Sequence, residues 1–248
     1  MVTQARIGSS SIEIAPLALG TNVFGWTADR DASFAVLDAF TRDGGNFVDT
    51  ADGYSHWVPG NGGGESETII GEWIANRAAR DRLVIATKVS THPQFLGLKA
   101  SNVRAAADAS LSRLQTDHID LYYAHFDDAE TPLEETVAAF SELVDAGKVR
   151  AIAVSNYTAD RVAEWIRIAR DGGYHLPVAL QPHYNLLARK EYEENVQPII
   201  DKHGVAVFPY FSLAAGLLTG KYASEEEIAG KQRTGQLERY ATKGAFAV

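Results

Sequence analysis

Three residues that can hold or move a proton stand at matching places in three successive apolar segments. Asp49 ends one segment, Lys88 follows the next, and His125 follows the third. An unpaired charge out of water costs several kcal/mol, so we expect Asp49 and Lys88 to form an ion pair. A purely structural pair that joins two strands is the alternative, and three titratable ends in succession favour a functional site.

Tyr54 lies five residues beyond Asp49, on a segment that can return its phenol to the same centre. A tyrosine has an ordinary pKa of about 10, and we expect the ammonium of Lys88 to lower it. Such a group suits proton donation to a carbonyl oxygen, with a neutral His125 as the hydrogen-bond donor that positions this oxygen. Loop packing for Tyr54 and a core position for His125 remain the alternatives.

The segments that must position these residues alternate between short apolar runs and longer helical patterns, which is typical of βα units and a parallel sheet. The expected strands are 16–19, 46–49, 83–87, 119–124, 151–155, 178–180 and 205–209. The expected helices are 31–43, 65–78, 101–114, 132–145, 159–170 and 191–202. A hairpin of 5–7 with 12–14 is expected before the first unit. No linker divides the chain, which predicts one domain over 1–248, with the hairpin at about 5–14, seven βα units at about 16–222 and a remainder at 223–248.

Polar residues also end the later strands, namely Ser155 with Asn156, then Gln181, then Tyr210. A doubly wound open sheet would spread such ends along one edge. A barrel would bring them together on one face, where active sites of that fold lie.

Composition excludes several classes of protein. The chain has 248 residues, of which 46% are hydrophobic, enough for a large core, so disorder is excluded. A net charge of -9 without a basic groove argues against binding to nucleic acid or to an anionic membrane. No apolar run of membrane-spanning length and no leader is found, and there is no cysteine, so we expect a cytoplasmic protein. The histidines lack paired-ligand spacing, so no metal site is expected.

Asp49, Tyr54, Lys88 and His125, in this order and context, resemble the catalytic tetrad of the aldo-keto reductases. The resemblance runs from about residue 5 to 222 and is greatest to the bacterial branch that is also similar to potassium-channel β subunits. Other matching segments are 19–21, 64–67, 147–150, 155–156, 181–185, 210 and 213–222.

The resemblance implies a (β/α)8 TIM barrel that binds NADPH across its carboxyl face and passes hydride to an aldehyde or ketone. It makes Tyr54 the general acid, Asp49 and Lys88 the pair that lowers its pKa, and His125 the group that orients the substrate. Tyr210 would stack on the nicotinamide. The residues expected to contact the cofactor are Gly20, Thr21, Asp49, Ser155, Asn156, Gln181, Tyr210, Phe211, Ser212, Leu213, Gly216 and Lys221.

The substrate is expected to be a small carbonyl compound, held by Tyr54 and His125 between Trp26 and Trp57. Loop packing is an equal alternative for the two tryptophans. Whether copies of the chain assemble into a homo-oligomer stays open.

The chain departs from the family at its end, where the eighth βα unit expected of the barrel is absent. Residues 240–248 have the pattern of a helix cut in its first turns. Three explanations are a sequence that lacks part of the natural protein, which we favour, an inactive truncated product, or completion by another copy. The preference for NADP over NAD rests on the resemblance alone.

Two other functions compete with the reductase. One is a regulatory or scaffolding subunit that binds the nucleotide with little turnover, and an intact tetrad argues against it. The other is a glycosidase, which needs two carboxylates at the sugar, whereas the strand ends offer Asp49 alone.

Overall fold

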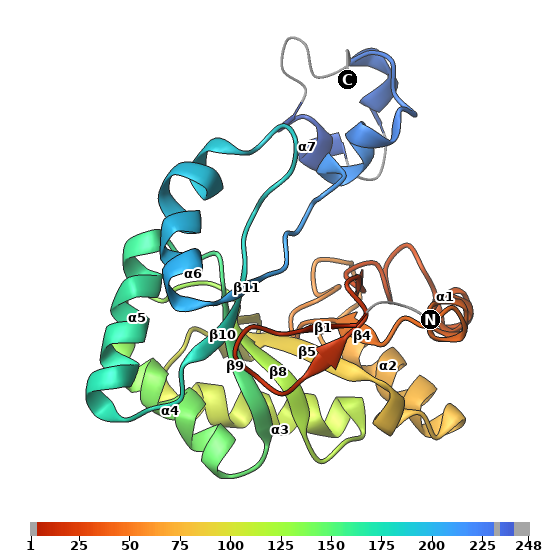
Figure 1. Ribbon diagram of the computed structural model, residues 1–248. Coiled ribbons are helices and arrows are strands. Elements are labelled where there is room, and N and C mark those ends of the chain that lie inside the picture. Colours follow the sequence, from red (N-terminus) through yellow and green to blue (C-terminus); the bar gives the residue numbers. More distant parts are fainter. Residues whose placement is uncertain (1–3, 231–233, 241–248) are drawn as a thin grey trace.

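A computed structural model describes residues 4–230 and 234–240 of the chain. In this part of the chain, seven parallel strands form one sheet that curls into an incomplete barrel, in the order β11-β10-β9-β8-β5-β4-β3 (Figure 1). The strands are β3 (Ala18–Gly20), β4 (Phe47–Asp49), β5 (Val84–Val89), β8 (Ile119–Ala124), β9 (Val149–Ser155), β10 (Pro177–Gln181) and β11 (Ala206–Val207). This is an α/β architecture of the barrel type that the sequence predicts.

Helices follow the strands along the chain, as expected for βα units. They are α1 (Arg30–Arg42), α2 (Glu65–Arg77), α3 (Ala100–Leu114), α4 (Leu133–Asp145), α5 (Ala159–Gly172) and α6 (Gln197–His203). One π-helical turn, Tyr192–Val196, leads into α6, and short 3-10 helices cover Arg80–Arg82, Ala214–Thr219 and Glu226–Ile228. Residues at the helix ends explain where the helices begin and end. At the start of α5, the Thr158 side chain accepts from Arg161 N, and Gly173, at φ 70°, ends this helix.

The sheet is buried on both faces, and its residues alternate between them. Outward side chains such as Val48 and Ile85 pack against helix residues such as Trp73 and Trp165. Inward side chains form a separate inner cluster, in which the strands contribute Phe47, Val84, Ala86, Leu121, Tyr123, Ala151, Ala153, Val178 and Ala179. Because both faces need apolar residues, these strands read in the sequence as continuous apolar runs.

The predicted N-terminal hairpin is confirmed as β1 (Ala5–Arg6) and β2 (Glu13–Ile14). Ile7 and Ile12 belong to the inner cluster, together with residues from the first positions of several strands. The hairpin turn lies so close to the sheet that a Cβ on Gly8, at φ +49°, would meet Val178 O at 2.2 Å. The hairpin therefore covers the amino end of the inner face and leaves the carboxyl end to the site.

Two features were not expected from the sequence. A second hairpin, β6 (Thr91–His92) with β7 (Phe95–Leu96), follows β5 directly. Residues 211–230 and 234–240, which include α7 (Thr234–Leu237), form a C-terminal lobe that lies beyond the barrel (Figure 1). The lobe has its own apolar cluster, made of Ala214, Ala215, Leu217, Ile228, Leu237 and Tyr240.

Two further predictions concern a membrane-spanning helix and a helix at the end of the chain. In the part of the chain that the structure describes, no helix is long and apolar enough to cross a membrane. The helix expected over 240–248 lies outside the described residues, apart from Tyr240.

Gly71 tests the packing of α2 on α3. A Cβ at this position would lie 2.1 Å from Arg113 O and 2.8 Å from Leu114 C. Gly71→Ala should therefore lower the free energy of unfolding in urea by about 1–3 kcal/mol, although alanine favours helix over glycine. Gly62→Ala, where no atom lies within 4 Å of the added Cβ, is the control. Equal stability of the two variants would contradict the close contact.

Candidate active site

The candidate site lies where the inward face of the sheet reaches the carboxyl ends of its strands. Asp49 comes two residues after Phe47, Lys88 two after Ala86, and His125 two after Tyr123, so all three point to the same side as the inner cluster. The same spacing relates Ser155 to Ala153 and Gln181 to Ala179. The sequence prediction that these ends converge is therefore explained by strand alternation.

Lys88 is the buried centre of this group, and its side chain is 0% exposed. Its Nζ donates to Asp49 Oδ2 at 2.7 Å, to the backbone oxygen of Thr50 at 2.7 Å and to Tyr54 Oη at 2.9 Å. Burial alone would lower the pKa of Lys88, but the neighbouring Asp49 and Tyr54 together raise it above its ordinary value. The ammonium is thus charged and its three donors are all used, and the predicted ion pair is confirmed.

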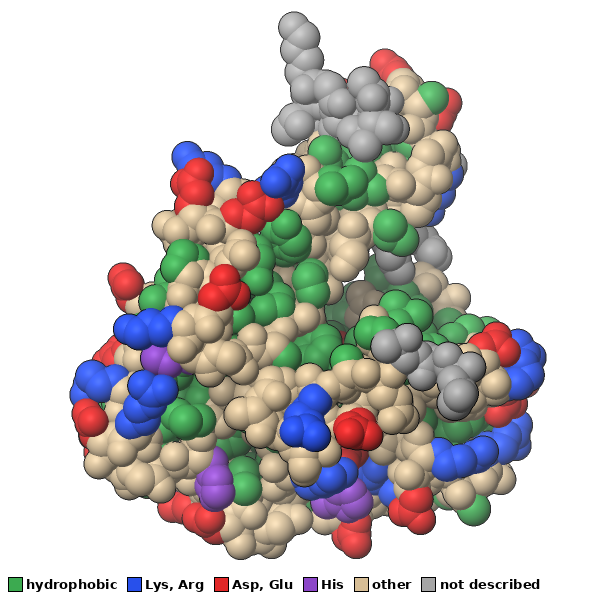
Figure 2. All heavy atoms as spheres, viewed as in Figure 1, with side chains coloured by type: hydrophobic (Ala, Val, Ile, Leu, Met, Phe, Trp, Pro, Cys, Tyr) green, Lys and Arg blue, Asp and Glu red, His purple; other side chains and the backbone are tan. Residues whose placement is uncertain are grey.

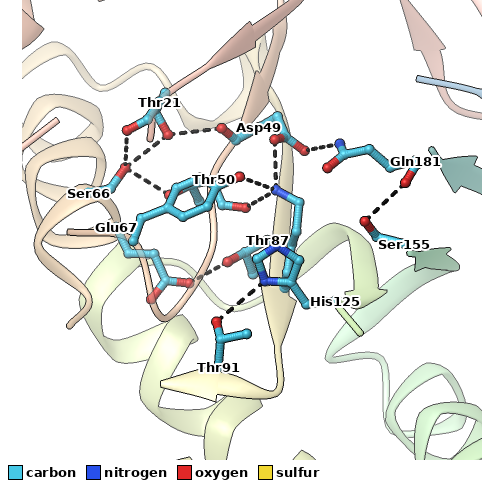
Figure 3. Close-up of polar contacts among 12 residues, drawn as sticks. Thr21, Asp49, Thr50, Ser66, Glu67, Thr87, Thr91, His125, Ser155 and Gln181 are labelled. Atoms are coloured by element: carbon cyan, nitrogen blue, oxygen red, sulfur yellow. Dashed lines mark hydrogen bonds and ion pairs between the residues drawn. The ribbon is translucent and has the colours of Figure 1, made fainter. Parts of the chain in front are cut away.

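Asp49 links Lys88 to a third strand, β10. Its Oδ2 accepts from Lys88 Nζ, and its Oδ1 accepts from Gln181 Nε2 at 3.0 Å. Figure 3 draws the contact between the Asp49 and Gln181 side chains. The carboxylate therefore connects β4, β5 and β10, and Gln181 Oε1 has no hydrogen-bond partner among the described residues.

Tyr54 reaches the group from the loop after β4. Its Oη accepts the hydrogen bond from Lys88, which leaves its own O–H free to donate toward the cavity that it lines. Ser55 fixes the loop, because its Oγ donates to Phe24 O at 2.8 Å. Burial raises the pKa of Tyr54 above its ordinary value, and the charge of Lys88 opposes this only in part. The expected net lowering of this pKa is therefore wrong, because loss of hydration outweighs the ammonium.

His125 faces Tyr54, with their ring centroids 6.0 Å apart. Burial and then the charge of Lys88 hold the pKa of His125 well below its usual range, so the imidazole is neutral at physiological pH. Its Nδ1 lies 3.5 Å from Thr91 Oγ1, on the hairpin that the sequence did not indicate. A neutral imidazole keeps one N–H, which is the donor a carbonyl oxygen needs.

The other half of the site comes from the ends of β9, β10 and the segment after β11. Ser155 Oγ donates to Gln181 O at 3.0 Å. Asn156 adopts φ 59°, donates from Nδ2 to His125 O at 2.9 Å, and accepts from Tyr210 Oη at 2.7 Å. These bonds make one continuous polar wall across three strand ends.

Tyr210 is supported from behind by His183. The two rings are stacked, with centroids 5.3 Å apart and an angle of 18° between their planes. One face of the Tyr210 ring is thus covered, and the residue also lines the cavity. This arrangement suits a flat ring on the cavity side of Tyr210.

These groups surround a cavity of about 500 Å³. The predicted site residues that line it are Gly20, Asp49, Tyr54, Trp57, His125, Ser155, Asn156, Gln181, Tyr210 and Phe211. The predicted residues that do not line it are Thr21, Trp26, Lys88, Ser212, Leu213, Gly216 and Lys221. Thr21 is buried instead, where its Oγ1 donates to Asp49 O at 2.9 Å, and Trp26 packs edge-on against Trp57 with centroids 5.8 Å apart.

Sequence reasoning missed several lining residues. They are Ala18, Asn22, Phe126, Phe208, Pro209, Gln236 and Arg239. Phe126 directly follows His125, so the strand-end pattern could have included it. Gln236 and Arg239 belong to the C-terminal lobe and follow no strand, so no local signal marks them.

The donor set suits a flat neutral amide and a sugar better than a metal ion. In the described part of the chain, no group of three or more His, Asp or Glu residues could hold a metal. An added Cβ at Gly20 would find no atom within 4 Å, so the wall is open there. The free Gln181 Oε1, the amide of Asn156 and the ring of Tyr210 together fit a nicotinamide riboside.

A second buried carboxyl lies in the Tyr54 loop. Asp52 is 0% exposed, and neither of its side-chain oxygens has a hydrogen-bond partner among the described residues. Burial and then the charge of Glu67 raise the pKa of Asp52 well above its ordinary value. Glu67 itself is satisfied, since it accepts from Arg113 Nε at 2.6 Å. It also accepts from Thr87 Oγ1, a contact drawn in Figure 3. Burial therefore favours the protonated form of Asp52.

Comparison with known proteins identifies a family for the chain. Residues 16–245 match the family described as "Aldo/keto reductase family". Norsolorinic acid reductase B of Aspergillus parasiticus is 33% identical over 91% of this chain and 60% of its own length. Aldo-keto reductase YhdN of Bacillus subtilis is 35% identical over 90% of this chain and 66% of its own length. Protein tas of Escherichia coli is 33% identical over 92% of this chain and 73% of its own length. The chain thus spans less than two thirds of the length of the first two relatives.

Asp52→Asn tests the buried proton. A carboxyl whose folded pKa is raised stabilises the fold fully below its unfolded pKa, and this contribution is lost as pH rises through the folded value. Asparagine has no such titration. The unfolding free energy of the variant minus that of the parent should therefore increase from about pH 4 upward, measured by urea denaturation at several pH values. Asp81→Asn, at an exposed position, controls for the lost charge. A difference that stays constant with pH would contradict a retained proton.

Proposed function

The chain belongs to the aldo/keto reductase family, and we propose that it reduces the carbonyl group of an aldehyde or ketone with NADPH. One observation carries the proposal. The phenol of Tyr54 accepts a hydrogen bond from the buried Lys88 ammonium and keeps its own O–H free at the cavity, beside the neutral His125. Relatives named as reductases support the same class of reaction.

The cofactor would lie against the polar wall. Tyr210, supported by His183, offers a ring for the nicotinamide to stack on. The side chains of Asn156 and Gln181 are placed to bind its carboxamide, and Asp49 lies where a ribose hydroxyl could donate to it. When bound, NADPH supplies the hydride that goes to the carbonyl carbon. The choice of NADPH over NADH rests on the family resemblance.

The chain's own residues supply the proton. Tyr54 donates its O–H proton to the carbonyl oxygen as the carbon gains hydride, so that an alcohol forms. The phenolate left behind keeps the hydrogen bond from Lys88, whose positive charge stabilises it. Asp49 keeps Lys88 charged and fixed in place. Because burial raises the pKa of Tyr54, the acid form persists across neutral pH, as reduction requires.

His125 orients the substrate. As a neutral imidazole it can donate one N–H to the carbonyl oxygen without competing for the proton of Tyr54. Asn156 fixes the backbone from which the ring projects, through its bond to His125 O. Trp57, which lies edge-on to Tyr54, and Phe126, which lies beside His125, also line the cavity and can pack against the substrate's apolar part. We therefore assign the region around Trp57 to the substrate.

Tyr54→Phe tests the proposed acid. Loss of the hydroxyl should lower kcat for an aromatic aldehyde by about 10²-fold or more, because a general acid contributes this much. NADPH affinity, followed by nicotinamide fluorescence, should stay nearly unchanged.

Tyr122→Phe is the matched control for this variant. It removes a buried hydroxyl without a partner among the described residues, on the outer face of β8. Unchanged turnover in Tyr54→Phe would refute the mechanism. NADPH binding by the parent chain with no turnover of any aldehyde would instead favour a nucleotide-binding regulatory subunit.

A further inference from the structure

The hydroxyl of Thr91 faces the imidazole ring of His125. Thr91 Oγ1 lies 3.5 Å from His125 Nδ1, and Figure 3 draws this contact. In the described part of the chain, neither of these two atoms has another hydrogen-bond partner. The distance is long for a hydrogen bond, but hydrogen bonds at catalytic sites often start long and shorten once the substrate is in place.

The two ring nitrogens of His125 have different surroundings. Nδ1 lies beside Thr91, which does not line the cavity, whereas His125 itself does. Nε2 has no hydrogen-bond partner within residues 4–230 and 234–240. The cavity is bounded by the barrel and by the C-terminal lobe, and Figure 2 shows the hollow between these two parts. The ring nitrogen left for a ligand in the cavity is therefore Nε2.

The hairpin of β6 and β7 holds Thr91 in place. Ser90 follows β5 at φ 133°, a positive value that a residue with a side chain rarely adopts, and turns the chain into the hairpin. Asn102, on α3, donates from Nδ2 to Phe95 O at 2.9 Å and to Gly97 O at 2.7 Å. Gly97 N donates to Ser90 O at 3.1 Å and closes the hairpin. The Thr91 side chain thus projects from a fixed base.

The loop that carries Tyr54 lies against the same hydroxyl. A Cβ added to Gly53 would lie 2.4 Å from Thr91 Oγ1, so the glycine is what lets the loop come this close. The carbon of Gly53 accepts no hydrogen bond, and His125 Nδ1 is the acceptor that the described residues offer to the Thr91 proton. Because a neutral imidazole has one N–H, a hydroxyl that donates to Nδ1 leaves the ring proton on Nε2.

We propose that Thr91 is a positioning residue, which donates a hydrogen bond to His125 Nδ1 and thereby keeps the imidazole proton on Nε2. The inference rests on the proposed function, in which the carbonyl oxygen accepts a hydrogen bond from His125. The opposite tautomer would point its N–H at Thr91 and present a lone pair to the carbonyl oxygen, which repels it. Thr91 therefore selects the tautomer that orients and polarises the substrate.

Nuclear magnetic resonance of the chain labelled with ¹⁵N at the histidine ring nitrogens reads the tautomer directly. His125 is assigned by the resonances that are lost in His125→Phe. In the parent at neutral pH, the couplings to the ring carbon-bound protons should place the N–H on Nε2 and show Nδ1 as a hydrogen-bond acceptor. Thr91→Val, which keeps the branched shape without the hydroxyl, should shift the Nδ1 resonance toward that of a free acceptor. This readout needs neither cofactor nor turnover.

Turnover measures the effect of Thr91 on the reaction. Thr91→Val should lower kcat/KM for an aromatic aldehyde by about 3–10-fold, which corresponds to one neutral hydrogen bond, and should leave the Kd for NADPH unchanged. Thr91→Ser keeps the hydroxyl, so it should recover most of the parent's kcat/KM and the parent's Nδ1 resonance.

Thr41→Val is the matched control. It removes a threonine hydroxyl that donates to Leu37 O at 2.8 Å within α1. Because Thr41 does not line the cavity, this variant should match the parent in both the His125 resonances and kcat/KM.

Three results would overturn the inference. A parent spectrum with the proton on Nδ1 would show that Thr91 accepts instead of donating. An unchanged Nδ1 resonance in Thr91→Val would exclude the hydrogen bond. Equal loss of kcat/KM in Thr91→Val and Thr91→Ser would show that Thr91 only packs against the ring. Failure of the parent to reduce any aldehyde, with the ring proton on Nε2, would instead refute the proposed function while the Thr91 contact stands, which separates the two.

Discussion

The rest of the site depends on the buried ion pair between Lys88 and Asp49. An ammonium without exposure to water is tolerated because a carboxylate, a backbone oxygen and a phenol accept its three hydrogen bonds. Removal of either partner would leave a buried charge unpaired, at a cost of about 3–5 kcal/mol. The pair joins β4 to β5, and Gln181 extends it to β10. The same contacts that stabilise the charge therefore fix the orientation of Tyr54.

The barrel-type sheet explains why these groups meet. Its inward side chains are apolar along the strands and become polar at the inward positions that end or follow β4, β5, β8, β9 and β10. The N-terminal hairpin covers the opposite end of the inner cluster, so hydration of the core is prevented there. Parallel strands place all carboxyl ends together, and alternation selects which residue of each end faces inward. These residues form one site because each lies at the inward-facing carboxyl end of its strand.

Sequence alone predicts much of this arrangement, because the strands are continuous apolar runs and their polar ends are conspicuous. The hairpin with Thr91 was missed because two-residue strands give no periodic signal. Thr21 adjoins a strand end but points into packing, which depends on its contact with Ser66. Arg239 reaches the cavity through the tertiary placement of the C-terminal lobe. The net direction of the Tyr54 pKa also needed the structure, since it depends on burial.

The central claim is that the chain itself transfers hydride within this cavity. The most direct measurement uses NADPH carrying deuterium at both positions of nicotinamide C4, with an aromatic aldehyde as acceptor, and analyses the alcohol product by mass spectrometry. The account predicts one deuterium at the carbinol carbon, formed at a rate proportional to the amount of protein. NADPH binding without labelled alcohol would contradict it, because a cavity that binds the nucleotide but transfers nothing would be a binding site and not a reductase.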